Sequence, residues 1–264
     1  MSTKKIDLLI IDSQIDFCEP TGRLSVKGAD EDMKRLAYFI KANKSKFNNI
    51  HVTLDSHHYL HIAHPIWWQS IDGKRPDAYT VISSKDVQGE NPKWKASNSL
   101  FAKRSIEYVT KLEKVGKELR IWPPHCLIGS VGHAIYEPLQ EALIEWEETF
   151  NIVNKVVKGM NILTEQYSVF KAEVPDTDDP DTFMNEEFIE KLDEADLILV
   201  AGEAKSHCVA ESMRDALIKL DPKKFIILED AMSSVTTCEK LGDDFFTEMK
   251  LKGVAFSTTK TLQI

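Results

Sequence analysis

The sequence predicts an α/β protein in which one open, mostly parallel β-sheet carries helices on both faces, a three-layer α/β/α arrangement. Three observations support this fold class. Short apolar runs alternate with amphipathic stretches, which is typical of β-α-β units. A chain of 264 residues is within the range of one large α/β domain and can bury an ample core. Reactive residues follow several apolar runs directly, at the carboxyl edge where such sheets bind ligands.

The predicted strands are short apolar runs, each bounded by polar or turn-forming residues. The first includes LLII near the N-terminus, and the last lies close to the C-terminus. They cover Asp7–Ile11, Ile50–Leu54, Ile152–Lys155, Leu197–Ala201, Phe225–Leu228 and Gly253–Phe256.

The predicted helices are the amphipathic stretches between these runs. They cover Asp30–Asn43, Leu100–Val115, His133–Glu148, Glu187–Glu194, Cys208–Leu220 and Cys238–Leu251. We expect a single domain over residues 1–264 with an insertion over about residues 65–120, which contains Trp67, Trp68 and Trp94. A lid, an oligomer contact and a decorated loop all remain open as roles for the insertion.

Composition narrows the class of partner. The net charge of −9 and the pI near 5.4 argue against nucleic acid and anionic membranes, which need clustered Lys and Arg, so a small-molecule partner fits better. No apolar run reaches the roughly 18 residues of a membrane span. Four cysteines without a C-x-x-C pair, and an N-terminus without a long apolar signal core, lead us to expect a cytoplasmic location. The sequence has no glycine-rich phosphate loop, so a nucleotide cofactor is not indicated. We expect the acidic run over residues 173–196, with DTDDPD at 176–181, to be a solvated face or loop, with a gate over the active site as the alternative.

Three scattered residues supply an acid, a cation and a thiol: Asp12 after LLII, Lys158 in KVVKG and Cys208 in GEAKSHCV. A cysteine nucleophile needs these groups for amide hydrolysis at neutral pH. Cys208 follows a strand and a small-residue turn and is expected to open a helix, whose positive end favours the thiolate. Each residue also has an ordinary interpretation, because an Asp can cap a turn, a Lys can be solvated and a lone Cys can be a small buried hydrophobe.

Asp55, His57 and His125 supply one oxygen and two imidazoles, a set suited to a divalent metal with open coordination positions. Asp55 and His57 point the same way because residues i and i+2 of a strand share a face. Zinc is the first choice, with iron and manganese as alternatives. A surface cluster of histidines would look similar, since the segment DSHHYLHIAHP holds four of the eight histidines. Whether His61 or His64 is an additional ligand is left open.

Six segments, in this order, resemble the nicotinamidases (pyrazinamidases) of the cysteine-hydrolase, isochorismatase-like superfamily. They run from near the N-terminus into the last third of the chain, so the resemblance covers most of one domain. They are IIDSQIDF at 10–17, RLSVKGA at 23–29, D-x-H at 55–57, WPPHC at 122–126, VKG at 157–159 with YSVF at 167–170, and GEAKSHCV at 202–209.

The resemblance implies the isochorismatase-like fold and a set of roles. Asp12, Lys158 and Cys208 would be catalytic, and Lys158 is preferred to Lys155 because the family's lysine directly precedes the glycine. The backbone N–H groups of Ala204 and Cys208 would form an oxyanion hole, with a cis peptide bond before Ala204.

The resemblance also implies that a metal at Asp55, His57 and His125 binds the pyridine nitrogen of nicotinamide, while Phe17 and Trp122 pack against the ring. The implied reaction is deamidation of nicotinamide to nicotinate and ammonia through a thioester, as part of NAD salvage. Asp16 is expected to hold loop backbone and not to take part in the chemistry.

The chain departs from the family's G-I-A-T-D-x-C pattern at Glu203 and Lys205, which leaves alternatives open. One is a cysteine amidase of the same fold that acts on a pyrazinamide-like, ureido or carbamoyl amide, and another is a catalytically silent binding or scaffold protein. An isochorismatase-type enzyme is disfavoured because that chemistry does not need Cys208. Homo-oligomerisation is left open.

Overall fold

The computed structural model describes residues 4–264 and has one six-stranded sheet at its centre, in the order β10-β9-β8-β1-β2-β7. Every neighbouring pair in this sheet is parallel, which confirms the predicted fold class. The strands are β1 (Ile6–Ile11), β2 (Asn49–Asp55), β7 (Asn154–Lys158), β8 (Leu197–Gly202), β9 (Phe225–Leu228) and β10 (Ala255–Ser257).

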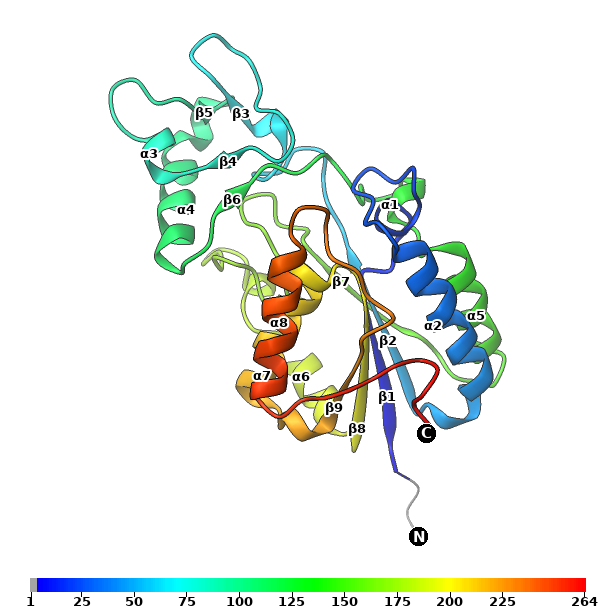
Figure 1. The fold of residues 1–264 in the computed structure, drawn as a ribbon. Helices are drawn as coiled ribbons and strands as arrows, with labels where there is room; N and C mark the ends of the chain where they lie inside the picture. The colour runs from blue at the N-terminus through cyan, green and yellow to red at the C-terminus, as the bar shows by residue number, and fades with distance from the viewer. Residues whose placement is uncertain (1–3) are drawn as a thin grey trace.

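Helices cover both faces of the sheet (Figure 1). The main helices are α2 (Ala29–Asn43), α5 (Glu137–Glu147), α6 (Glu186–Asp193), α7 (Ala210–Lys219) and α8 (Glu239–Leu251), and a short helix α1 (Ile15–Cys18) follows β1. The two faces follow from β1, whose six residues are all buried. Leu8 and Ile10 pack into the core that contains α2 and α5, whereas Leu9 and Ile11 pack into the core that contains α6, α7 and α8. A strand buried on both faces reads as an unbroken apolar run because its side chains alternate between two cores.

Several predicted boundaries differ from the structure by two to four residues, including the starts of β10 and α4 (Ala102–Lys114), expected at Gly253 and Leu100. The third strand was expected at Ile152–Lys155 but β7 begins at Asn154, and Ile152 is 85% exposed. As an edge strand with a solvated side, β7 has a weak apolar pattern. The helix expected from His133 begins at Glu137, because a 3-10 turn precedes it and Pro138 occupies its first turn. The helix expected from Cys208 begins at Ala210, after a π-helical turn over Lys205–Val209.

The segment over residues 65–120 projects beyond the carboxyl edge of the sheet (Figure 1). Its elements are β3 (Trp68–Gln69), β4 (Val81–Ile82), α3 (Ser84–Val87), β5 (Lys95–Ala96), α4 (Ala102–Lys114) and β6 (Leu119–Arg120), with β3 antiparallel to β5 and β4 antiparallel to β6. The buried indoles of Trp67 and Trp68 donate to Ser105 Oγ and to the carbonyl of Ile62. That this segment is an insertion within one domain stays a prediction.

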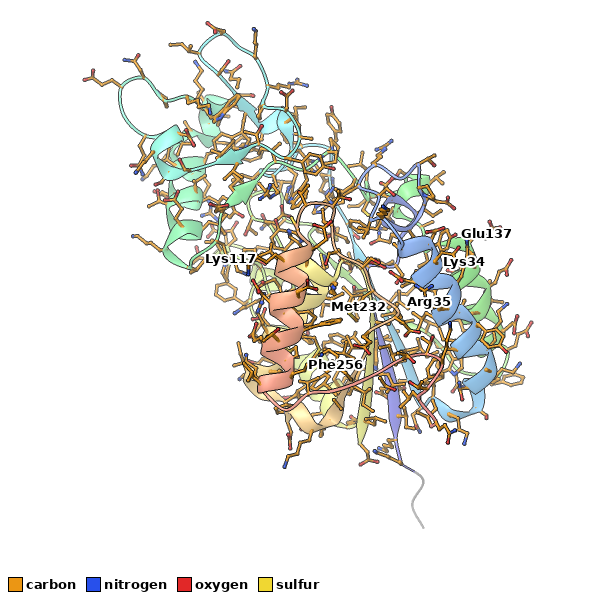
Figure 2. All side chains as sticks on the ribbon, viewed as in Figure 1. Lys34, Arg35, Lys117, Glu137, Met232 and Phe256 are labelled. Carbon is orange, nitrogen blue, oxygen red and sulfur yellow. The ribbon has the colours of Figure 1, made fainter. Side chains whose placement is uncertain are left out.

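Ion pairs connect this segment to the rest of the molecule. Lys117, labelled in Figure 2, pairs with Glu173 and with Glu211 of α7. Arg104 of α4 pairs with Asp176 at 2.6 Å. Asp176 is only 3% exposed, so the expectation that the whole acidic run is solvated is wrong at this residue. Within residues 4–264, no helix has the length and apolar character that a membrane crossing requires.

Candidate active site

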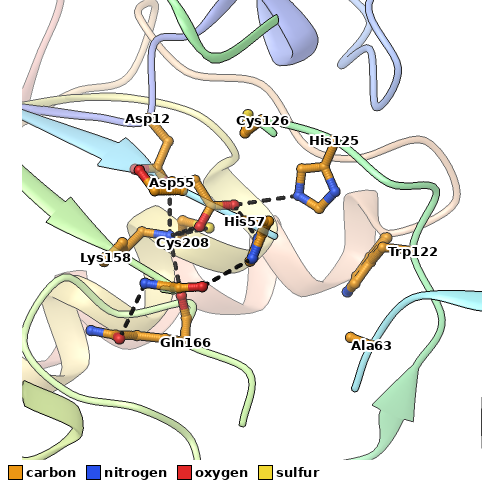
Figure 3. Close-up of polar contacts among 12 residues, drawn as sticks. Asp12, Asp55, His57, Ala63, Trp122, His125, Cys126, Lys158, Gln166 and Cys208 are labelled. Atoms are coloured by element: carbon orange, nitrogen blue, oxygen red, sulfur yellow. Dashed lines mark hydrogen bonds and ion pairs between the residues drawn. The ribbon is translucent and has the colours of Figure 1, made fainter. Parts of the chain in front are cut away.

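The reactive residues meet at the carboxyl edge of the sheet, as the positions after the apolar runs predict (Figure 3). Asp12 follows β1, Asp55 ends β2 and Lys158 ends β7. Asp55 and Lys158 are directly opposite each other in the pairing of β2 with β7. Cys208 lies in the π-helical turn between β8 and α7. Four separate segments of the chain therefore contribute to one cluster.

Lys158 is the centre of this cluster, and its side chain is fully buried. Its Nζ lies 2.8 Å from Asp12 Oδ2, 2.9 Å from Asp55 Oδ1 and 3.7 Å from Cys208 Sγ, and it donates to the carbonyl of Gln166 at 3.1 Å. Burial alone would lower the pKa of Lys158, but the two carboxylates hold it well above its usual range. The buried ammonium therefore stays charged and paired. The competing candidate, Lys155, is exposed on β7.

The Cys208 thiol is buried, and burial raises its pKa well above its usual range. Lys158 lowers this pKa, as expected, but the effect of burial is larger, and the carboxylate of Asp12 adds to the increase. The expectation that the surroundings favour the resting thiolate is therefore wrong. A thiol that keeps its proton needs a base beside it before it can act as a nucleophile.

Asp12 is the carboxylate placed to be that base. Thr53 of β2 donates to Asp12 Oδ1 at 2.5 Å, and the Thr53 hydroxyl accepts from the backbone N–H of Asp12 at 3.0 Å. Burial raises the pKa of Asp12, whereas Lys158 opposes the change. A raised pKa makes a carboxylate a better proton acceptor, and the hydroxyl and ammonium hold its orientation.

The turn before Cys208 has the expected cis peptide bond between Glu203 and Ala204. Among residues 4–264, no backbone carbonyl accepts from the N–H of Ala204. Gly202 is required in this turn, since a Cβ there would lie 2.1 Å from the carbonyl oxygen of Ile11. Lys205 points towards α8, where its ammonium pairs with Asp243 at 3.3 Å.

Asp55, His57 and His125 lie together: one possible ligand atom from each falls within 4.8 Å of the others. The Nε2 atoms of His57 and His125 are 3.0 and 3.3 Å from Asp55 Oδ2. Their Nδ1 atoms face the backbone carbonyls of Gly159 at 3.2 Å and Pro123 at 2.9 Å.

A carbonyl can only accept, so both Nδ1 atoms carry protons, and with a metal bound both Nε2 lone pairs would point to one position beside Asp55 Oδ2. Carbonyls behind the rings orient imidazole ligands in metal sites in the same way. Two imidazoles and one carboxylate with open positions fit a borderline divalent ion. Gly159 is needed here, because its φ is +79° and a Cβ would lie 2.8 Å from Asp55 Oδ1.

His61 and His64, the other two histidines considered as ligands, differ in whether a ring nitrogen has a lone pair available to a metal. His61 donates from Nε2 to the carbonyl of Thr164 and accepts the N–H of Ala63 at Nδ1, so it has no lone pair for a metal. His64 faces the carbonyl of Tyr59 through Nδ1, and its buried Nε2 has no partner within residues 4–264. The ring centroids of His64 and His57 are 5.5 Å apart.

A small cavity of about 30 Å³ lies between the thiol and the histidines. Phe17 and Trp122, the two predicted substrate-contacting aromatics, both line it, and the ring of Phe17 meets that of His125 edge-on at 5.3 Å. Trp122 donates to the Tyr167 hydroxyl at 2.9 Å. Sequence reasoning did not single out Glu165, Tyr167 or His207, which also line the cavity, although the last two lie inside the matched segments.

Gln14 and Asp16 help to position the site, although neither lines the cavity. Gln14 Nε2 donates to the carbonyl of Asp55 at 2.8 Å, and Gln14 Oε1 accepts the N–H of Asp55 at 2.7 Å. These two bonds fix the backbone at the end of β2. Sequence reasoning missed this role, for which the only signal was the position of Gln14 within the first matched segment. Asp16 accepts the backbone N–H of Cys126 at 2.7 Å, which agrees with its expected role in holding loop backbone.

Comparison with solved structures identifies the fold. A nicotinamidase/pyrazinamidase of Acinetobacter baumanii is 20% identical over 100% of both chains, with a TM-score of 0.66. Yeast nicotinamidase bound to the inhibitor nicotinaldehyde is 18% identical over 96% of this chain and 99% of its own, with a TM-score of 0.67. The zinc complex of Pyrococcus horikoshii pyrazinamidase is 19% identical over 96% of this chain and 99% of its own, with a TM-score of 0.59.

This chain has the nicotinamidase fold. The similarity extends over 99–100% of the length of those three structures and over 96–100% of this chain. No protein-family model and no curated protein sequence matches the chain. At these identities the comparison establishes the architecture, and the activity has to be argued from the site.

Proposed function

We propose that this protein is a metal-dependent cysteine amidohydrolase that converts nicotinamide to nicotinate and ammonia. The observation that carries the proposal is the position of the Lys158 ammonium, which touches Asp12, Cys208 and the candidate metal ligand Asp55 at once. Support also comes from similar structures, described as a yeast nicotinamidase with nicotinaldehyde and a Leishmania infantum protein with nicotinate. Such an activity would belong to cytoplasmic NAD salvage.

The first half of the reaction forms a thioester. Asp12 takes the thiol proton of Cys208, and the sulfur attacks the carboxamide carbon while the carbonyl oxygen gains negative charge. The backbone N–H groups of Ala204 and Cys208 are the donors for this oxygen. The C–N bond then breaks as Asp12 returns the proton to nitrogen, so ammonia leaves and the acyl group stays on sulfur.

The second half releases the acid. Asp12, again a carboxylate, takes a proton from the attacking water, whose oxygen forms a bond to the acyl carbon. The C–S bond breaks, the proton on Asp12 returns to the sulfur, and the carboxylic acid product gives its remaining proton to solvent and leaves as the carboxylate. Lys158 stays protonated throughout, stabilises the transient thiolate and holds the Asp12 carboxylate in place.

Asp55, His57 and His125 would hold the metal, with zinc the first choice because the similar pyrazinamidase structure is a zinc complex. A bound divalent ion would supply a Lewis acid for a ring nitrogen of the substrate. Phe17 and Trp122 would contact the ring and exclude water, which leaves the carboxamide beside Cys208.

A second candidate is hydrolysis of a different small amide by the same cluster. Glu165 and His207 are among the lining residues, but the lining is mainly apolar, so the cavity favours a small, mostly apolar amide without selecting one ring system. A catalytically silent binding role is disfavoured, because the thiol, base, ammonium and candidate ligands lie within contact of one another.

The experiment is ammonia release from nicotinamide by the purified protein, with zinc, iron or manganese supplied and after chelation, and with Cys208→Ala as the control. Turnover that requires both metal and thiol is the expected result. If the metal-loaded protein releases no ammonia from nicotinamide, the nicotinamidase proposal is wrong, and pyrazinamide and ureido compounds become the next substrates to test.

A further inference from the structure

Glu203, one of the two departures from the family pattern, is a buried acid behind the turn that precedes Cys208. Its side chain is 0% exposed. Glu203 Oε2 accepts the backbone N–H of Ser233 at 3.0 Å. Glu203 Oε1 has no hydrogen-bond donor within residues 4–264. An ionised carboxylate in this position would leave one charged oxygen without water and without a hydrogen-bond donor, which costs desolvation free energy.

The neighbour of Glu203 is a second acid, Asp32 of α2, which is 4% exposed. Asp32 Oδ2 accepts from the Ser233 hydroxyl at 2.5 Å, and Oδ1 pairs with Arg35. Both acids meet at Ser233, whose backbone N–H donates to Glu203 Oε2 and whose hydroxyl donates to Asp32 Oδ2, so the two carboxyl groups lie side by side. Two carboxylates can only accept, so one proton is needed before the two side chains can bond.

Other charged groups around the pair make Glu203 the protonated member. Arg35 also donates to the carbonyl of Asp230 at 2.8 Å, and Figure 2 shows it on α2 beside the loop that contains Met232. Its guanidinium is paired with Asp32 and so favours the charge there. The buried thiol of Cys18 is close enough for the charge of Glu203 to raise its pKa, and it carries no positive charge. Burial, and then Asp32, raise the pKa of Glu203 well above its usual range.

The bonds around Glu203 hold the turn from both sides. The N–H of Gly202 donates to the carbonyl of Ala231 at 2.9 Å, and the N–H of Lys205 donates to the carbonyl of Ser233 at 2.8 Å. The Glu203 carboxyl adds a third bond to the same loop between them. The residues on both sides of Ala204 are therefore hydrogen-bonded to the loop that contains Ala231 and Ser233. Asp32 connects this loop to α2. The N–H of Ala204, the proposed oxyanion donor, is held in place by these bonds.

We propose that Glu203 and Asp32 share one proton, and that this acid pair is a positioning element for the backbone N–H of Ala204. The role rests on the proposed amide hydrolysis. Loss of the proton at high pH places two negative charges together in a dry loop, which pushes the turn away from the position that donates to the developing oxyanion. The turnover number then falls, whereas KM, set by the ring pocket, changes little.

The test compares Glu203→Gln with Glu203→Ala. A glutamine can accept from Ser233 and donate to Asp32 without a proton to lose. We expect Glu203→Gln to keep most of the turnover number at neutral pH and to lose the alkaline decline that Glu203 causes. We expect Glu203→Ala to lower the turnover number about 10-fold or more with KM within about 3-fold, since removing one oxyanion donor costs about 10²–10³ in kcat. Asp7→Asn, a change at an equally buried acid paired with His51, is the matched control and should leave the profile unchanged.

Infrared spectroscopy gives a readout that does not depend on activity. Because Glu165 is also protonated at neutral pH, the readout is a difference spectrum. The spectrum of the wild type minus that of Glu203→Gln should contain the carbonyl band of a protonated carboxylic acid, and the spectrum of the wild type minus that of Asp7→Asn should not. A difference spectrum of wild type and Glu203→Gln without that band, or an alkaline decline unchanged in that variant, overturns the proposal. If the wild type hydrolyses no amide, the proposed function fails and the positioning role fails with it, while the band still decides whether the proton is shared.

Discussion

Asp55 and Lys158 lie opposite each other on β2 and β7, with Asp55 Oδ1 2.9 Å from Lys158 Nζ. The second oxygen of the same carboxylate faces the Nε2 atoms of His57 and His125. One side chain thus joins the candidate metal site to the catalytic cluster. Burial alone would raise the pKa of Asp55, but His57 and Lys158 hold it well below its usual range, so the carboxylate is charged and ready to bind a cation.

Lys158→Met should abolish activity and destabilise the protein. The substitution leaves the buried carboxylates of Asp12 and Asp55 without their cation, and breaking a buried pair costs about 3–5 kcal/mol. Urea denaturation and ammonia release measure the two effects. Lys155→Met, on the exposed part of the same strand, is the control, and equal losses in both variants would contradict the assignment.

Asp12→Asn should lower the turnover number by about 10²–10⁴, the usual contribution of general acid–base catalysis, with little change in KM. Asparagine keeps the size of the side chain and an oxygen for the Thr53 hydroxyl but cannot take the thiol proton. Steady-state kinetics, with circular dichroism to confirm folding, measure the effect. Wild-type turnover in this variant would show that another group removes the proton.

His57→Ala and His125→Ala should each lower the affinity for zinc, because each removes one of three convergent ligands. Elemental analysis after dialysis against a limiting metal concentration measures the bound ion without reference to turnover. His58→Ala, at an exposed neighbouring position, should bind as much metal as the wild type. Equal metal content in all variants would place the ion elsewhere.

Glu165 should make the metal-free protein less stable as the pH rises. Burial raises its pKa to about 8 from an ordinary value of 4.5. Between about pH 4.5 and pH 8, the native state therefore binds more protons than the unfolded state. Its contribution to stability is fully present below about pH 4.5 and is lost as the pH rises through about 8. Glu165→Gln should flatten that part of the curve of melting temperature against pH, and an unchanged curve would contradict a raised pKa.

Much of the architecture could be predicted from local patterns. The unbroken run ending at Ile11 predicts a strand buried on both faces, and the polar residues after it predict a site at the carboxyl edge. Asp12, Asp55, Lys158 and Cys208 were found in this way, with the family resemblance choosing among ordinary alternatives. The start of β7 was missed because an edge strand with a solvated side has a weak apolar pattern.

By itself, the sequence determined which strands form, which reactive residues follow them and which chemistry those residues can support, because periodicity and side-chain chemistry are local properties. Only the tertiary structure decided the state of those groups. Burial reversed the expected shift of the Cys208 pKa, and the fold brought Glu203 beside Asp32 and left His64, but not His61, with a free lone pair. Desolvation and contacts between distant segments depend on how the whole chain packs, and no local pattern records them.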